Sequence, residues 1–423
     1  MSVQGSQLNK ATSESSLAMA WSWVDAFFVS LMVGVGESYF AAFALAKGFS
    51  EIHAGLLTTL PLVLGAAVPL FFVNWVSFVK SLKRWVVWAA AFQSLSLVGL
   101  ALVSVLPEPP VVLVFTLATL YFAAGFMVAP AWNFWMGTLV DDAQASSFFA
   151  QRLRLTQIGL FVGLLVGGVL LHHPPQMFEK SSLMPIFGLL FLLAAFFRLV
   201  SVASLAAQKQ SSRLEFPQSY SLLESIELIL ARPGALKFFM FLFVFYVVIF
   251  ITSPFVSPFF LAELKFDYQS YMIALVALMV GKAMSLPWGA RWIQRFGVKK
   301  IFLLGALGIS PLPALWAFDR SFEFALFLQW VSGIFWALFE LSFSVIFFNQ
   351  LRAKEKMPFL SLHQFFNSAA ILCGSLLGAL ILRSAGDHSH GYDFMFVLGS
   401  GLRVCVVLAF AWWVRHEHKF FQD

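Results

Sequence analysis

Five charged side chains stand inside long apolar stretches of this sequence, where water is scarce. They are Asp25, Glu37, Lys282, Glu340 and Arg403. A charge at the centre of a lipid bilayer costs about 2.5–3.5 kcal/mol on insertion scales, so each group is expected to face a partner or a wet cavity. The chemistry open to them is ion pairing, proton exchange and binding of a charged solute.

Glu37 is the best candidate for proton exchange. It lies in the segment Gly34–Tyr39, whose glycines thin a helix and let a neighbour or a ligand approach. Burial disfavours the charged form of a carboxyl group, and no cation stands beside it on the same stretch. A carboxyl group hydrogen-bonded to an adjacent helix would explain the same position. We group Glu37 and Tyr39 as candidate substrate contacts.

Lys282 and Glu340 are expected at similar depth in the bilayer. Counted from the same face at 1.5 Å per residue, they lie ~20 Å and ~22 Å into their helices. A structural ion pair would explain both residues. Substrate binding, or proton coupling at Glu340, is the alternative, and the two are compatible because a substrate can compete for either member of a pair.

Asp25, Arg152 and Arg154 are expected near the same end of their helices. They could form a gate, although solvated charges at the membrane interface are the more common explanation for such residues. Arg403 is interpreted as structural, through pairing or through snorkelling of its long side chain.

Aromatic and small residues follow one face of two apolar stretches, because positions i, i+4, i+8, i+11 and i+15 share a helix face. One set is Tyr121, Gly125, Ala129, Trp132 and Met136, and the other is Gln329, Gly333, Trp336, Glu340 and Ser344. A third stretch carries Tyr246 and Ser253, and Pro254 and Pro258 are expected to kink it. Such faces suit a pocket for an organic solute, although simple filling between helices explains most of the 14 tryptophans.

The composition requires a bilayer around these residues. Hydrophobic residues make up 60% of the 423-residue chain and charged residues 11%, with 51 phenylalanines; average soluble proteins have roughly 45–50% and about 25%. Twelve apolar runs are long enough to span about 30 Å of hydrocarbon, the fifth and ninth only just. They are 20–45, 56–79, 85–105, 111–136, 155–171, 183–205, 235–261, 268–292, 301–318, 322–348, 358–382 and 394–414.

Lysine and arginine orient these helices. With both termini placed in the cytoplasm, the inner segments hold a roughly four-to-one excess of basic residues over the outer ones, as the positive-inside rule requires. The predicted organisation is a cytoplasmic tail (1–16), a six-helix bundle (17–205), a cytoplasmic linker (206–234), a second six-helix bundle (235–415) and a tail (416–423). Within the linker, Tyr220–Leu230 is amphipathic and is expected to lie on the inner membrane surface.

The two halves resemble each other. Gly163 and Gly167 in the fifth run match Gly374 and Gly378 in the eleventh, and basic clusters follow the second and eighth runs. Similar features six helices apart indicate a duplicated unit. The predicted fold is an all-α membrane protein with twelve transmembrane helices in two six-helix repeats.

The whole chain resembles the major facilitator superfamily. The segment 290–299, after the eighth run, keeps Arg295, Gly297 and Lys299 of that family's loop signature G-x-x-x-D-R-x-G-R-[KR], but has Ala290 and Gln294 in place of its Gly and Asp. The first copy keeps only basic residues. The resemblance implies that helices 1, 4, 7 and 10 surround a central cavity, that Arg295 belongs to a cytoplasmic gate, and that the two halves rock. The missing Asp implies that the gate uses other partners.

The function expected from these features is secondary active transport of a small organic solute by alternating access, with a proton as a candidate coupling ion. The alternative is a transporter-shaped assembly or signalling protein without coupled transport. Motifs for ATP binding, hydrolases and zinc proteases are absent from the sequence, which argues against an enzyme. We expect no cofactor, metal or nucleic-acid partner, a monomer in the bilayer, and a bacterial inner membrane location.

Overall fold

The computed structural model describes residues 2–72, 79, 81–137, 139–172, 184–208, 224, 226–227, 230–231, 233–266, 268–350, 353–384 and 388–416. Over these ranges the chain is helical and contains no strand. Twelve of its helices are long and apolar enough to cross a membrane, which confirms the predicted count and the all-α class. Most of the predicted linker, including the amphipathic segment Tyr220–Leu230, and the tail after His416 lie outside the described residues.

The helices divide into two compact units, which we describe separately. Unit 1 comprises Met1–Ser225 together with Arg352–Leu362, and unit 2 comprises Ile226–Leu351 together with His363–Asp423. Unit 1 contains α1 (Ser2–Val35), η1 (Glu37–Tyr39), α2 (Phe40–Ala46), α3 (Glu51–Phe72), α5 (Leu82–Ser104), α6 (Val111–Met136), α7 (Asp142–His172) and α8 (Met184–Ala207). In this unit α1 packs on α7 and α8, α5 on α6 and α8, and α3 on α6.

Unit 2 repeats this plan with its own interruptions. It contains α10 (Pro233–Thr252), η2 (Ser253–Phe255), α11 (Val256–Pro258), η3 (Phe259–Glu263), α12 (Tyr268–Phe296), α13 (Val298–Ile309), α14 (Leu312–Leu315), α15 (Phe322–Gln350), α16 (Ala353–Ser384) and α17 (His388–His416). The beginning of α16, up to Leu362, belongs to unit 1. The helix α12 packs on α15, α13 packs on α15, and α10 packs on α17.

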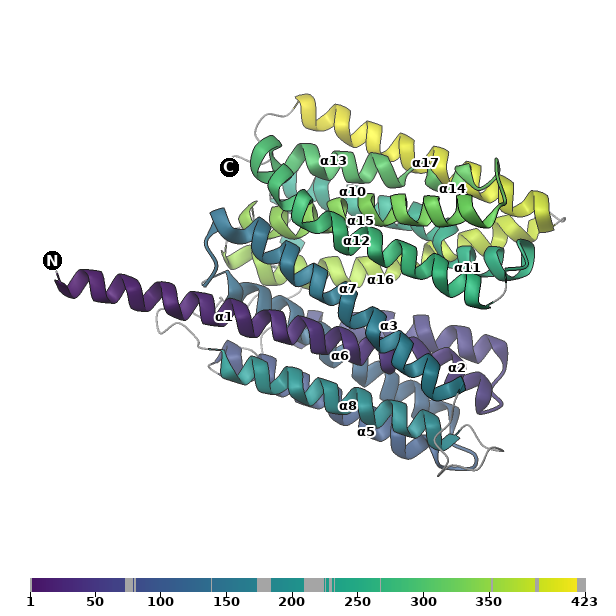
Figure 1. Cartoon of the computed structure of the whole chain (residues 1–423), viewed down its shortest axis with the longest axis horizontal. Helices are drawn as coiled ribbons and strands as arrows, with labels where there is room; N and C mark the ends of the chain where they lie inside the picture. Colours follow the sequence, from purple (N-terminus) through teal and green to yellow (C-terminus); the bar gives the residue numbers. More distant parts are fainter. Residues whose placement is uncertain are drawn as a thin grey trace. The chain divides into compact units, whose positions relative to one another are not determined.

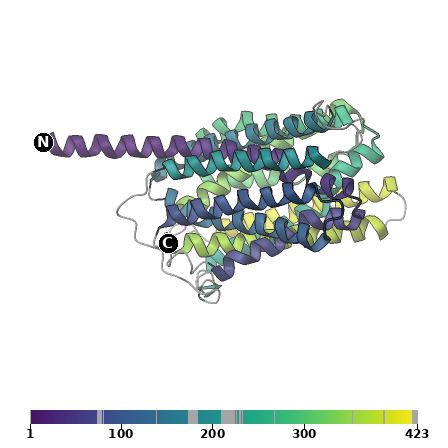
Figure 2. The same cartoon turned by 90° about the horizontal axis from the view of Figure 1, so that it is seen from below.

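Two helices of unit 1 are longer than their apolar runs. The fifth span was expected to be short, but α7 begins at Asp142 and provides an apolar span from Ala143 to Leu171. The polar residues before position 155, which obscured its beginning, belong to the same helix. The polar segment before position 17 is also helical, and it carries α1 beyond the ends of its neighbours α7 and α8 (Figures 1 and 2).

The first helix of each unit is interrupted at an equivalent place. In unit 1 the helix stops at Val35 and continues through the 3-10 turn Glu37–Tyr39 into α2. In unit 2 it stops at Thr252 and continues through the 3-10 turn Ser253–Phe255. Pro254 lies in this second turn and has no N–H to donate, so the expected kink is a real break.

Glycines bring the interrupted helices close to their neighbours in the same way in both units. A Cβ at Gly163 of α7 would lie 2.6 Å from the Leu31 carbonyl oxygen, and one at Gly374 of α16 would lie 2.4 Å from that of Val247. The ring of Tyr39 covers Gly167, and the ring of Phe255 covers Gly378 in the same fashion. The glycine pairs noticed in the sequence therefore serve close helix packing, and they do so at matching places in the two units.

We predict that Gly163→Ala destabilises unit 1. The added methyl group would meet the Leu31 carbonyl oxygen and the Gly34 Cα atom, which cannot move away without shifting α1. Overpacking of this kind costs about 1–3 kcal/mol, so the thermal unfolding midpoint in detergent should fall.

The control is Gly401→Ala in α17, where an added Cβ has no atom within 4 Å. This variant should unfold at or above the wild-type temperature. If the unfolding midpoint falls equally in Gly163→Ala and Gly401→Ala, the packing role of Gly163 is contradicted.

Candidate functional site

The carboxyl group of Glu37 lies at the break in the first helix of unit 1 and accepts a hydrogen bond from α6. The Tyr121 hydroxyl donates to Glu37 Oε2 at 2.8 Å. Tyr121 is only 1% exposed and packs edge-on against Phe40 and Phe122. The sequence showed no partner for Glu37 on its own helix. The structure supplies one from α6, namely Tyr121, which was predicted to bind substrate.

Tyr39 is held by α7 through backbone and packing contacts. Its hydroxyl donates to the Leu164 carbonyl oxygen at 2.7 Å, and its ring fills the space above Gly167. The adjacent Gly36 has no room for a side chain, because a Cβ there would lie 2.8 Å from the Ala194 Cβ of α8. These contacts fix the turn that carries Glu37, so the carboxyl group has a defined position relative to α6.

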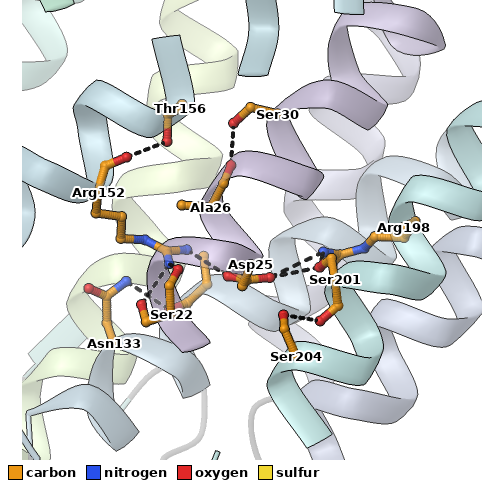
Figure 3. A network of polar contacts seen from close by, with 11 residues as sticks. Ser22, Asp25, Ala26, Ser30, Asn133, Arg152, Thr156, Arg198, Ser201 and Ser204 are labelled. Atoms are coloured by element: carbon orange, nitrogen blue, oxygen red, sulfur yellow. Dashed lines mark hydrogen bonds and ion pairs between the residues drawn. The ribbon is translucent and has the colours of Figure 1, made fainter. Parts of the chain in front are cut away.

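A second polar cluster of unit 1 centres on Asp25 (Figure 3). Arg152 donates from Nη2 to Asp25 Oδ2 at 2.9 Å and from Nη1 to the Ser22 hydroxyl at 2.8 Å. On the other side, the Ser201 hydroxyl donates to Asp25 Oδ1 at 2.7 Å, and Arg198 Nη1 donates to that hydroxyl oxygen at 2.8 Å. Asp25 therefore joins α7 to α8 through α1.

Burial distinguishes this cluster from a solvated interface. The exposed fractions of the side chains are 4% for Asp25, 2% for Arg198 and 18% for Arg152. The Arg152 guanidinium also lies 3.9 Å from the ring centroid of Trp132, a cation–π arrangement. Trp132 was predicted to contact substrate, but in unit 1 it packs between Arg152 and Phe148.

Arg198 was missed by sequence reasoning. It was counted among the cytoplasmic basic residues, yet α8 places it 4.0 Å from Asp25 and almost fully buried. The available signal was its position several residues before the end of the apolar run 183–205, which makes it a charge within the span rather than after it.

In unit 2, Lys282 of α12 and Glu340 of α15 form the predicted ion pair. Lys282 Nζ donates to Glu340 Oε1 at 2.6 Å, and the exposed fractions of the two side chains are 13% and 31%. The Lys282 amine also lies 5.6 Å from the ring centroid of Trp336. Close approach of the helices makes the pair possible, because Gly281 and Gly333 face each other between α12 and α15.

Tyr246 of α10 completes this group. Its ring lies 6.2 Å from the ring of Phe339, against which Trp336 also packs at 6.1 Å, and 6.0 Å from the ring of His363. Four residues predicted for substrate binding, namely Tyr246, Lys282, Trp336 and Glu340, thus gather within unit 2. Each of them is only partly buried.

Arg403 has the structural surroundings expected of it. It is 3% exposed and donates to the carbonyl oxygens of Ile249 at 2.9 Å and Ile309 at 3.4 Å, and to the Thr252 hydroxyl. These carbonyls lie where α10 and α13 end, and helix ends leave carbonyl groups without intrahelical partners. A cation also suits the negative end of a helix dipole. The arginine thus stabilises the broken end of α10.

Comparisons with known proteins fit this arrangement. Residues 238–420 match the family model of the Major Facilitator Superfamily. A solved mutant of the nucleoside transporter NupG is 15% identical, with a TM-score of 0.64 over 93% of this chain and 99% of its own. The E. coli fucose:proton symporter FucP is 13% identical, with a TM-score of 0.69 over 94% and 99%. This model match covers less than half of the chain, so it shows a likeness to this superfamily in the second half of the sequence. The solved structures show that the fold of the chain is similar to that of transporters.

A further solved member of this superfamily, the proton:xylose symporter XylE, is 14% identical with a TM-score of 0.69, covering 95% of each chain. At such identities the likeness shows the fold. The search of curated proteins found no match.

The superfamily loop signature has a clear structural role at one position. Gly297 separates α12 from α13 with φ of +88°, a conformation that L side chains rarely adopt. The predicted gate residues Arg154 and Arg295 have exposed side chains, whereas Arg152 is paired with Asp25 inside unit 1. Among the described residues, no group of three or more His, Cys, Asp or Glu side chains could hold a metal ion.

We predict that Asp25→Asn strongly destabilises this protein. The change leaves two largely buried guanidinium groups with no carboxylate partner in the cluster, and breaking a buried ion pair in this way costs about 3–5 kcal/mol. Thermal unfolding of the purified protein in detergent or nanodiscs measures the loss.

Ser204→Ala is the matched control in the same layer of α8. Its hydroxyl donates only to the Ser201 carbonyl oxygen, so this change should have a much smaller effect. If Asp25→Asn lowers the thermal stability no more than Ser204→Ala does, the role given to Asp25 is contradicted.

Proposed function

We propose that this protein is a secondary active transporter that moves a small organic solute across a membrane by alternating access, with a proton as the coupling ion. The observation that carries the proposal is the carboxyl group of Glu37, held at a break in a membrane-spanning helix by a tyrosine of another helix. An ionisable group inside a membrane span is costly to maintain, which favours a functional role.

The partial match to the superfamily model and the similar solved structures support the same conclusion. The matching structures include a nucleoside transporter, a fucose:proton symporter and a proton:xylose symporter. Their substrates are polar organic molecules, and two of these relatives move protons. For this chain we propose a solute of similar size, with both termini in the cytoplasm and residence in a bacterial inner membrane.

We assign different tasks to the two carboxyl groups. Glu37 has a neutral hydrogen-bond donor as its direct partner, so it can change protonation without leaving an adjacent cation unpaired. Glu340 contacts the Lys282 ammonium at 2.6 Å, so the loss of its charge would leave that cation without its partner. Glu37 is therefore the proton carrier, and the Lys282–Glu340 pair with Trp336 and Tyr246 contacts the solute.

The test of function begins with a panel of nucleosides, L-fucose, D-xylose and amino acids. Stabilisation of the purified protein against heat identifies ligands, because a ligand that binds the folded state raises the unfolding temperature. Uptake of each hit into proteoliposomes is then measured with and without an imposed proton gradient. Binding without transport under any gradient would favour the alternative, an assembly or signalling protein with the transporter fold.

We predict that Glu37→Gln separates coupling from binding. The amide preserves size and hydrogen bonding to Tyr121 but cannot exchange a proton. Gradient-driven accumulation should be lost, while ligand binding and ligand exchange across the membrane stay within a few-fold of wild type. Accumulation that ignores a proton ionophore in the wild type and persists in Glu37→Gln would refute proton coupling.

We predict that Glu340→Gln weakens ligand binding at least tenfold and that Lys282→Met added to it partly restores binding. The single change leaves Lys282 charged without its carboxylate, and the second change removes this stranded charge. Ligand titrations on the two single variants and the double variant measure the interaction as a double-mutant cycle. Additive losses would show that the pair does not act as a unit.

A further inference from the structure

Two side-chain amides of α16 carry buried acceptor atoms that the described part of the chain does not satisfy. Gln364 Oε1 and Asn367 Oδ1 are both buried and have no hydrogen-bond partner among the described residues. The two residues stand at positions i and i+3 of one helix, so their side chains are neighbours on its surface. Buried polar groups of native proteins are nearly always hydrogen-bonded. These two oxygens therefore need a donor that the described chain does not supply.

Ring contacts place this part of α16 beside Tyr246 of the candidate solute site. The His363 ring lies 6.0 Å from the Tyr246 ring of α10 and stacks at 4.8 Å on the Phe343 ring of α15. Asn367 follows His363 by one helical turn and shares its face of α16. Gly374 lies on the same face, and a Cβ there would lie 2.4 Å from a carbonyl oxygen of α10. Asn367 thus stands between two contacts with α10, on the side of α16 that carries them.

Further contacts join Tyr246 to the Lys282–Glu340 pair. The rings of Tyr246 and Trp336 both pack against the buried Phe339, at 6.2 Å and 6.1 Å. The Lys282 amine lies 5.6 Å from the ring centroid of Trp336. The amides of α16 and the ion pair therefore belong to one region of unit 2, which α10, α12, α15 and α16 surround.

The chemistry of this region favours an uncharged solute. Lys282 and Glu340 are paired at 2.6 Å, and an amide has no net charge. A charged solute would lose its hydration without meeting an unpaired opposite charge in this group, which is costly. A hydroxyl group is both a donor and an acceptor, so it can donate to an amide oxygen and accept from the Lys282 ammonium.

We propose that Gln364 and Asn367 contact the solute and select an uncharged molecule with several hydroxyl groups, such as a monosaccharide or a nucleoside. Their oxygens accept hydrogen bonds from solute hydroxyls, while the Lys282–Glu340 pair and the neighbouring rings bind the rest of the molecule. The inference rests on the proposed function in taking the surroundings of this pair as the solute site. It adds α16, which was not among the helices expected to surround the cavity.

The first test compares two sets of probes by thermal shift and by titration on the purified full-length protein. The uncharged set is D-glucose, D-xylose, L-fucose, myo-inositol and uridine, and the charged set is glycine, glycine betaine and choline. At least one uncharged probe should stabilise the protein against heat, and each charged probe should bind more weakly than it does.

The second test asks whether the amide oxygens meet hydroxyl donors. Analogues of the best-binding probe are used in which one hydroxyl group at a time is replaced by fluorine, which cannot donate a hydrogen bond. At least one analogue should bind wild-type protein about tenfold more weakly than the parent. Asn367→Leu or Gln364→Leu should weaken binding of the parent by a similar factor and remove its advantage over that analogue.

Two controls separate solute binding from structural damage. Asn367→Leu removes a buried oxygen that has no partner, so the unfolding temperature without ligand should stay at or above that of wild type. Ser375→Ala changes a hydroxyl on the same helix that donates to the Ile371 carbonyl oxygen, and it should leave probe affinity unchanged.

The inference is overturned if no uncharged probe binds, if a charged probe binds most tightly, or if both leucine variants keep wild-type affinity. Should a variant not fold, the fluorinated analogues decide on wild-type protein alone, because equal affinity for all of them excludes hydroxyl donation. The inference and the proposed function fail separately. Binding that depends on Asn367 without transport would reject only the transporter, whereas proton-driven uptake of an amino acid would reject only the role of α16.

Discussion

A charge held between helices in a membrane has no bulk water to solvate it, and the protein must supply a partner within hydrogen-bond distance. This requirement decides which helices meet in each unit. Asp25 draws α7 and α8 to opposite sides of α1, and Lys282 and Glu340 connect α12 to α15. Arg403 meets the same requirement without an acid, through carbonyl oxygens at the ends of two helices.

Such contacts need close backbones, and glycine provides them. The approach of Gly163 to Gly34 in unit 1 and of Gly281 to Gly333 in unit 2 leaves no space for a Cβ at these positions. Association of helices in lipid depends on van der Waals packing rather than on release of water, so small residues at crossings contribute directly to stability. The glycines and the buried charges therefore act together in fixing the interior of each unit.

The duplicated plan carries different chemistry in its two copies. Each first helix breaks into a 3-10 turn whose last residue, Tyr39 or Phe255, covers a glycine of a neighbouring helix. The first residue of the turn is Glu37 in unit 1 and Ser253 in unit 2. The break in unit 1 therefore presents an ionisable group to α6, whereas the carbonyl groups freed at the break in unit 2 are bound by Arg403. The two breaks are therefore alike in backbone structure but differ in the side chains that meet them.

The sequence alone determined the helix count and the duplication, which follow from apolar length and from a repeated spacing. It also placed Lys282 and Glu340 at similar depth, from a fixed rise per residue, with an ion pair as one of two explanations. It gave no partner for Glu37, and for Asp25 it named Arg152 and Arg154 only as candidates. The reason is that Tyr121, Arg152 and Arg198 come from helices whose rotation about their axes depends on packing. The same limit concealed the surroundings of Arg152 in the first turns of α7, where Asp25 and Trp132 lie beside it. Only tertiary structure decides such pairings, because sequence gives the depth of a charge in a helix but not the direction in which it points.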